Sequence, residues 1–158
     1  MKKQKGFSLI ELLIVVAIIL IIAAIAIPNL MRSKMAANES SAVGSLRTIN
    51  TAEVTYSTNN PTIGFAAALA NLGGVCPSGT AATAAAACLI DNILATGTKS
   101  GYVFVATAGA TVPAVTYTSS ATPQSVNQSG TRSFCSDESG VIYASVGAGA
   151  CTQGTNPL

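Results

Sequence analysis

Residues 7–27 read FSLIELLIVVAIILIIAAIAI, an apolar run interrupted by Ser8 and by one carboxylate, Glu11. A span of about 20 apolar residues is what a helix needs to cross the hydrocarbon core of a bilayer. An ionised side chain at membrane depth is costly, so Glu11 is a candidate functional residue. The run follows the basic leader Met1-Lys2-Lys3-Gln4-Lys5-Gly6, whose charge favours a cytoplasmic N-terminus. The sequence therefore predicts a membrane-inserted N-terminal helix.

Outside this run the chain carries little charge. Charged residues make up 9% of the 158 residues, well below the roughly 25% of ordinary soluble domains. The net charge of +2 includes three leader lysines, so without residues 1–6 five basic and six acidic side chains remain, a net charge of −1. We therefore expect no nucleic-acid binding, and a surface suited to dense packing in an assembly. A secreted, uncharged and glycosylated protein is the alternative.

The four cysteines, Cys76, Cys88, Cys135 and Cys151, all lie beyond the apolar run. An even number of cysteines in a small exported domain indicates disulfides. Three pairings are possible, and we favour Cys76–Cys88 with Cys135–Cys151 because each closes a short loop; free buried thiols are the alternative. The sequence has no histidine and no Cys-x-x-Cys, so a zinc site has poor support. No metal or cofactor is expected.

An amphipathic segment follows the apolar run. Its apolar residues recur at intervals of three, four or seven: Met31, Met35, Ala42, Leu46, Ile49 and Tyr56. Its polar residues are expected to occupy much of the remaining surface: Arg32, Lys34, Asn38, Glu39, Arg47 and Asn50. We predict one long helix from about Phe7 to Thr58, with a kink or weak point at Pro28, which lacks a backbone donor. Asn59-Asn60-Pro61 is the stop signal.

The last third of the chain has a β pattern. Short β-branched and aromatic runs occur at 102–105, 115–118, 132–135 and 141–144, and Asp137-Glu138-Ser139-Gly140 is a candidate tight turn. Before them, residues 65–72 and 91–94 are expected to form short helical pieces. The predicted fold class is α+β, with the long N-terminal hydrophobic helix packed on a small antiparallel β-sheet head of about four strands.

These patterns divide the chain into five segments. Residues 1–6 are the leader, and residues 7–28 are the hydrophobic transmembrane helix. Residues 29–58 are the amphipathic half of the long helix, and residues 59–100 are a connecting αβ region. Residues 101–158 hold the antiparallel sheet and the C-terminal disulfide loop.

The leader also carries a processing pattern. Gly6 precedes Phe7, and Glu11 and Pro28 are the fifth and twenty-second residues after that glycine. The stretch resembles the class III leader of type IV pilins and pseudopilins. The resemblance implies the type IV pilin fold, cleavage between Gly6 and Phe7 by a membrane prepilin peptidase, and N-methylation of Phe7 by the same enzyme. An uncleaved signal anchor, or a secretory signal cut near Ala23-Ala24-Ile25-Ala26, is the alternative.

The resemblance gives Glu11 and Pro28 roles in assembly. It implies that Glu11 of one subunit pairs with the Phe7 amine of a neighbour in the growing fibre. A protonated Glu11, or one paired with its own amine, is the alternative. Pro28 either bends the helix or, as the resemblance implies, marks where it melts in the filament, and the sequence does not separate the two.

The body of the chain resembles compact pilins with two head disulfides, at residues 51–56, 99–102 and 130–134. The resemblance implies a structural subunit of a type IV pilus, a homo-oligomeric helical filament. Its precursor would lie in the bacterial inner membrane, and the pilus assembly machinery would polymerise it into an extracellular fibre for motility, adhesion or DNA uptake. A type II secretion pseudopilin and a monomeric membrane-anchored binding domain are the alternatives.

Catalysis has little support in the sequence. Without histidine, the acid–base repertoire is small, and no catalytic residue is expected. Asp137 and Glu138 are adjacent in the head, an arrangement typical of a solvated turn, and two acids do not make a calcium shell. We therefore expect a structural protein and not an enzyme.

Overall fold

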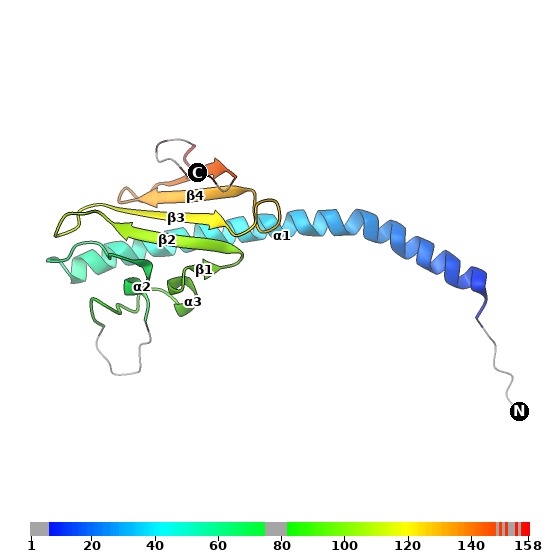
Figure 1. Cartoon of the computed structure of the whole chain (residues 1–158), viewed down its shortest axis with the longest axis horizontal. Helices are drawn as coiled ribbons and strands as arrows, with labels where there is room; N and C mark the ends of the chain where they lie inside the picture. Colours follow the sequence, from blue (N-terminus) through cyan, green and yellow to red (C-terminus); the bar gives the residue numbers. More distant parts are fainter. Residues whose placement is uncertain (1–6, 75–81, 148, 150, 152–153, 155) are drawn as a thin grey trace, which may run out of the picture. The chain divides into compact units, whose positions relative to one another are not determined.

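A computed structural model describes residues 7–74, 82–147, 149, 151, 154 and 156–158 (Figure 1). The chain forms two compact units, Met1–Lys34 and Met35–Leu158, and we call the second unit the head. Helix α1 (Leu9–Asn59) belongs to both units. The head thus consists of the second half of α1 and of everything that follows it.

The long helix predicted from the sequence is confirmed as α1. It runs through Pro28 without interruption, so the predicted weak point does not end it. Its C-terminus is closed by Asn60, whose backbone N–H and side-chain Nδ2 donate to the Tyr56 carbonyl at 2.9 and 3.0 Å. Pro61 follows at once, and because proline cannot donate, the helix does not continue.

The head contains a five-stranded antiparallel sheet. Its strands are β1 (Thr98–Lys99), β2 (Tyr102–Ala108), β3 (Tyr117–Pro123), β4 (Arg132–Asp137) and β5 (Ile142–Val146), and they lie in chain order (Figure 1). Every neighbouring pair is antiparallel. The sheet is a meander, so the predicted α+β class is confirmed, with one strand more than expected.

The predicted strand limits were partly wrong. The run expected at 115–118 overlaps β3 only at Tyr117 and Thr118, since β3 begins at Tyr117. The strand then continues through Ser119, Ser120 and Ala121. Serine and alanine are not strand-favouring residues, and pairing with β2 and β4 on both sides decides their conformation. Strand β1 has only two residues, too few for the alternation of apolar and polar residues by which a strand is predicted from sequence.

Two short helices lie between α1 and the sheet. They are α2 (Leu69–Leu72), which is shorter than the piece expected at 65–72, and α3 (Asn92–Ala95), which is shifted by one residue from the piece expected at 91–94. Asp91 caps α3, since its Oδ1 accepts from the Leu94 N–H at 2.8 Å. The other oxygen pairs with Lys99 Nζ at 2.8 Å, which connects α3 to β1.

The core of the head lies between α1 and the sheet. Strand β2 alternates buried and exposed residues, so Tyr102, Phe104 and Ala106 all lie in the core. The helix contributes the stripe predicted from the sequence: Ala42, Leu46, Ile49 and Tyr56, with Ala52 in addition. Met31 was also predicted for this stripe, but it precedes the head and is exposed.

Candidate functional site

The apolar segment of α1 leaves its large side chains exposed. Phe7 exposes 77% of its surface, and between Leu9 and Ile27 the large hydrophobic residues expose from 44% to 73%. Among the described residues, α1 is the one helix long and apolar enough to cross a membrane, with a mean hydropathy of 3.3 in its most apolar window. Soluble monomers rarely expose so large a contiguous apolar surface. The segment therefore requires a membrane or partner helices around it.

Glu11 lies at the start of this apolar segment. Its side chain is exposed and has no hydrogen bond or ion pair to any described residue. The helix begins directly after Phe7, where the Ser8 carbonyl accepts from the Leu12 N–H at 3.2 Å. Gly6 and the rest of the leader lie outside the described residues. An amine created at Phe7 would therefore stand at the first turn of the helix, four residues before Glu11.

Pro28 lies inside α1, directly after the apolar run. It has no N–H to donate to the carbonyl of Ala24, four residues earlier, although the helix continues on both sides. One turn later, the Ser33 hydroxyl donates to the Asn29 carbonyl at 3.0 Å. Pro28 thus removes one intrahelical bond without ending the helix.

In the head, Glu39 connects α1 to the start of β4. Its Oε1 accepts from the Thr131 N–H and hydroxyl, both at 2.8 Å, and its Oε2 accepts from two Arg132 nitrogens at 2.9 and 2.8 Å. Although burial acts to raise its pKa, these hydrogen bonds and the Arg132 charge together hold the pKa of Glu39 below its usual value. The side chain therefore acts as an ionised four-bond acceptor.

Asn50 connects α1 to three parts of the sheet. Its Nδ2 donates to the Ser136 hydroxyl at 2.8 Å and to the Gly140 carbonyl at 3.4 Å, and its Oδ1 accepts from the Tyr117 hydroxyl at 3.0 Å. Ser136 in turn donates to the Val141 carbonyl at 2.8 Å. Burial raises the pKa of Tyr117, so its hydroxyl remains a donor. This satisfied network fixes α1 against β3 and the β4–β5 turn.

Glu53 is fully buried, with 0% of its surface exposed. Its Oε2 accepts from the Ala66 N–H at 2.8 Å, whereas Oε1 has no hydrogen-bond partner among the described residues. Burial raises the pKa of Glu53 to about 7, and the Ala66 bond counteracts this only in part. The carboxyl therefore holds the loop 60–68 against α1 with one oxygen and leaves the other unpaired.

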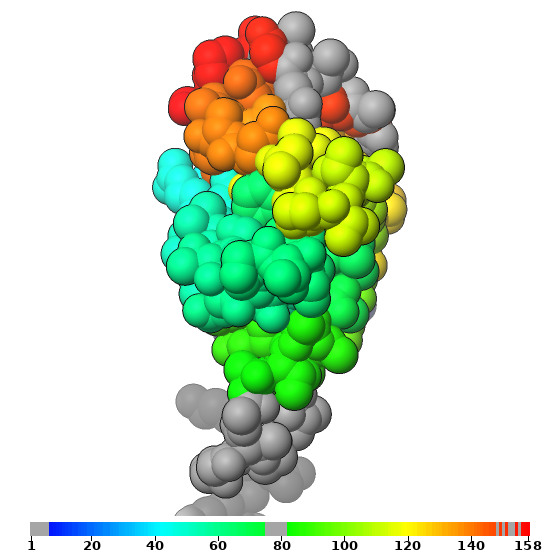
Figure 2. All heavy atoms as spheres, turned by 90° about the vertical axis from the view of Figure 1, so that its left-hand side faces the viewer, coloured from blue at the N-terminus to red at the C-terminus, as the bar shows by residue number. Residues whose placement is uncertain are grey.

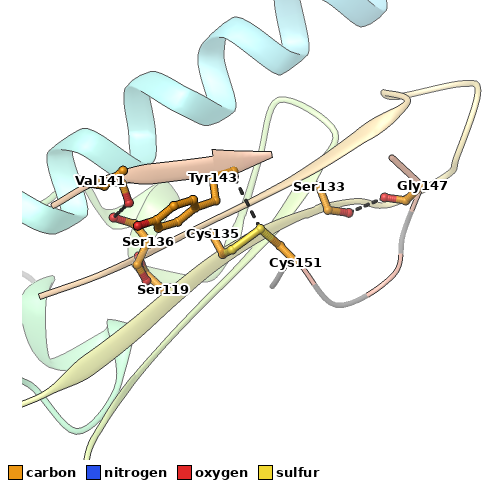
Figure 3. Close-up of a disulfide and its surroundings, with 8 residues drawn as sticks. All are labelled: Ser119, Ser133, Cys135, Ser136, Val141, Tyr143, Gly147 and Cys151. Atoms are coloured by element: carbon orange, nitrogen blue, oxygen red, sulfur yellow. Dashed lines mark hydrogen bonds between the residues drawn. A yellow bond between two sulfur atoms is a disulfide. The ribbon is translucent and has the colours of Figure 1, made fainter. Parts of the chain in front are cut away.

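A disulfide closes the C-terminal part of the sheet (Figure 3). Cys135 in β4 is bonded to Cys151, sixteen residues later, which confirms one predicted pair. The Cys151 sulfur lies 3.4 Å from the Tyr143 carbonyl oxygen, and the Ser133 hydroxyl donates to the Gly147 carbonyl (Figure 3). The bridge and these contacts attach the chain after β5 to the middle of β4.

The second predicted disulfide is only partly described. Cys88 is disulfide-bonded, whereas Cys76 lies outside the described residues. The Cys76–Cys88 pairing therefore stays a prediction.

The structure changes the interpretation of three polar residues on α1. Glu39 and Asn50 were expected on the surface, but they are buried, with 7% and 9% exposed, and Asn38 is half-buried. Asn38 Nδ2 donates to the Ser129 carbonyl at 2.8 Å. A usable signal lies in the spacing: Glu39 is three residues from the core residue Ala42, Asn50 is four from Leu46, and Glu53 is four from Ile49. Their partners, more than 80 residues away for Asn38, Glu39 and Asn50, left no signal.

The acidic pair in the head forms the turn expected from the sequence. Asp137 Oδ1 accepts from the Ser139 N–H at 2.9 Å, and the Asp137 carbonyl accepts from the Gly140 N–H at 2.9 Å. Within the described residues, no three histidine, cysteine or acidic side chains gather where they could hold a metal ion. The Asp137 carboxylate thus serves the local turn.

Comparison with known proteins finds a family match at the N-terminus and three similar relatives. A family model described as the prokaryotic N-terminal methylation motif matches residues 1–27. A type IV wide pilus major component of Thermus thermophilus is 59% identical over 39 residues, which are 25% of this chain and 30% of that protein. A type IV major pilin of Myxococcus xanthus is 46% identical over 54 residues, 34% of this chain and 24% of the relative.

A type II secretion system core protein G of Escherichia coli is 36% identical over 58 residues, covering 37% of this chain and 40% of its own length. The chain thus spans well under half the length of each of these relatives. No solved structure matches the chain. Its N-terminal methylation motif, its exposed apolar helix and its α+β head support the resemblance of the chain to the type IV pilin and pseudopilin family.

Proposed function

We propose that the chain is a structural subunit of a type IV pilus. It is held in the bacterial inner membrane as a precursor and is polymerised through the first half of α1 into an extracellular filament. The observation that carries this proposal is the exposed apolar face of α1 behind a methylation-motif leader. An apolar surface of that length is stable in lipid before assembly and among the helices of other copies afterwards.

Processing prepares the chain for assembly. Prepilin peptidase cuts between Gly6 and Phe7 and methylates the new amine of Phe7. Glu11, which has no partner among the described residues, then pairs with the Phe7 amine of a neighbouring copy. Charge compensation of this kind relieves the cost of a carboxylate in an apolar environment and sets the position of each arriving subunit. Pro28 lowers the stability of α1 where the apolar segment ends.

The test is made on protein sheared from the cell surface. We expect fibres by negative-stain microscopy, an N-methylated Phe7 as the first residue, and an intact mass that includes two disulfides. The Glu11→Gln chain should be processed normally but form few or no fibres. A retained leader, a start after Ala24 or Ala26, or fibres from Glu11→Gln equal to those of the parent chain would contradict the corresponding part of the proposal.

A pseudopilin is the second candidate, favoured by the similarity to the type II secretion core protein. Such a subunit would form a short periplasmic assembly and not a long surface fibre. Processed protein that is absent from the sheared fraction but crosslinks into oligomers in the cell envelope would favour it. Monomers alone in the membrane would instead favour an anchored binding domain.

A further inference from the structure

The loop 60–68 is attached to two parts of the head. Glu53 Oε2 accepts from the Ala66 N–H at 2.8 Å. Two backbone bonds connect the same loop to the β2–β3 connection: the Ala114 N–H donates to the Ile63 carbonyl at 2.8 Å, and the Phe65 N–H donates to the Ala114 carbonyl at 3.1 Å. Figure 2 shows the two segments next to each other on one end of the head. A change at Glu53 therefore reaches both of them.

These two segments carry exposed apolar side chains. Val112, Val115 and Ile63 expose 87%, 66% and 39% of their surfaces. The surface formed by these three residues, which we call the distal patch, includes no charged side chain. Its arrangement depends on the loop 60–68, which two side-chain bonds connect to α1: Asn60 to the Tyr56 carbonyl at the start of the loop, and Ala66 to the Glu53 carboxyl further along it.

The carboxyl of Glu53 lies where a negative charge is poorly compensated. It is fully buried, and its Oε1 is without a partner among the described residues. The titratable groups that interact with this region are Tyr56 and Tyr117, with Asp137 and Glu138 acting in turn on Tyr117. None of them is a cation, and among the described residues the Ala66 N–H is the group that partly compensates a negative charge on Glu53. Ionisation would leave an unpaired buried charge, which costs much more than a neutral carboxyl.

We propose that Glu53 is a pH-sensitive latch of the head, which when protonated holds the loop 60–68 on α1 and when ionised releases it. Release of the loop breaks the backbone bonds that Ile63 and Phe65 form with Ala114. Ionisation of Glu53 therefore alters the distal patch. The opening equilibrium follows from proton linkage: the closed state binds the proton more tightly than the open state, so rising pH favours opening. The proposal concerns the head and does not depend on whether the chain forms a pilus.

The magnitude follows from the two proton affinities. The carboxyl has its ordinary pKa of 4.5 when the loop is open and a pKa of about 7 when it is closed. Between about pH 5.5 and pH 8.5, linkage of these two values increases the open fraction by about thirtyfold. Most of the change occurs below the closed-state pKa, and the profile becomes flat above it.

Amide hydrogen exchange of the loop measures this opening. The mature full-length chain in detergent micelles is compared with Glu53→Gln, whose neutral amide mimics the protonated carboxyl. Taking the ratio of the two chains at each pH cancels the intrinsic pH dependence of exchange. Protection of residues 60–68 in the parent chain should fall about thirtyfold relative to Glu53→Gln between about pH 5.5 and pH 8.5. Glu138→Gln, the matched change at an exposed glutamate, should leave the profile of this loop unchanged.

A parallel dependence of parent and Glu53→Gln on pH would overturn the proposal. If Glu53→Gln does not fold, infrared titration of the Glu53 carboxyl tests the proposal instead. The titration is measured in a Glu11→Gln chain, so that the carboxyl of the apolar segment does not contribute to the band. We expect a protonated-carboxyl band that disappears with a midpoint near 7. Disappearance of the whole band near the ordinary glutamate pKa would refute the latch.

Discussion

Replacing Glu39 with glutamine should destabilise the head, because the site supplies four donors and needs four acceptor positions. Two donors from Thr131 reach Oε1, and two from Arg132 reach Oε2, all at 2.8–2.9 Å. A glutamine amide has one oxygen and one NH2 group, so in either orientation its NH2 faces a pair of donors. Two of the four bonds are therefore lost, and the glutamine NH2 group faces the donors of either Thr131 or Arg132.

The expected loss is moderate because the pair is only partly buried. The side chain of Glu39 is 9% exposed, whereas the Arg132 side chain is 45% exposed and can turn to water. A hydrogen bond to a charged group contributes about 1.5–3 kcal/mol, and solvent screening of Arg132 reduces its share, so we expect about 2–3 kcal/mol in total. At about 4 °C per kcal/mol for a unit of this size, the melting temperature should fall by about 8–12 °C.

The assay is thermal unfolding of the mature chain in detergent micelles, followed by near-ultraviolet circular dichroism. The four tyrosines, at positions 56, 102, 117 and 143, all lie in the head, so the signal reports on this unit alone. Glu138→Gln is the matched control, because Glu138 is exposed and its side chain forms no hydrogen bond or ion pair with a described residue. Its melting temperature should equal that of the parent chain.

The pH dependence gives a second, independent test. The folded pKa of Glu39 lies below its ordinary value of 4.5, so the stabilisation is present above that value and is lost as the pH falls through the folded pKa. The difference between parent and Glu39→Gln should therefore shrink in acid. A melting temperature of Glu39→Gln no lower than that of Glu138→Gln, or a difference that grows in acid, would refute the reasoning.

Two further substitutions test the packing of the head by the same assay. Tyr117→Phe removes a buried donor to Asn50 Oδ1 at 3.0 Å and should cost about 1–2 kcal/mol; an unchanged melting temperature would show that the network is not formed. Gly130→Ala should destabilise strongly, because a Cβ there would collide with the Tyr102 hydroxyl, whereas a Cβ at Gly44 would meet nothing within 4 Å. Gly44→Ala should therefore stabilise α1 by about 0.5–1 kcal/mol, and equal effects of the two alanines would contradict the described packing.

The elements predicted well from the sequence are those fixed by local pattern. The apolar run and the stripe at Ala42, Leu46, Ile49 and Tyr56 specify a helix and its buried face, because helical period and burial act over a few residues. The turn at Asp137 was recognised for the same reason, since its carboxylate bonds to a backbone two residues away. The Cys135–Cys151 pair closes a short loop and was accessible to the same argument.

What escaped prediction depends on residues distant in the chain. Glu39, interpreted as a surface residue, is buried because Thr131 and Arg132 come to it from more than 90 positions away. Strand β3 contains serine and alanine where isolated propensity favours a loop, and two neighbouring strands supply the pairing that overrides it. Partners of this kind leave no periodic signal, so buried polar residues on a helix are easily taken for solvent-facing ones.

The three glutamates of α1 show how position alone assigns different chemistry to one residue type. Glu11 stands exposed in an apolar segment without a described partner, and the proposed assembly supplies its counter-charge from another copy. Glu39 finds Arg132 within its own head and remains ionised, so it stabilises the fold except in acid. Glu53 finds only the Ala66 N–H and no cation among the described residues, so its stabilising state is the protonated one. Acidification should therefore weaken the Glu39 link and strengthen the Glu53 link, and the head should be held by both only in the interval between their two pKa values.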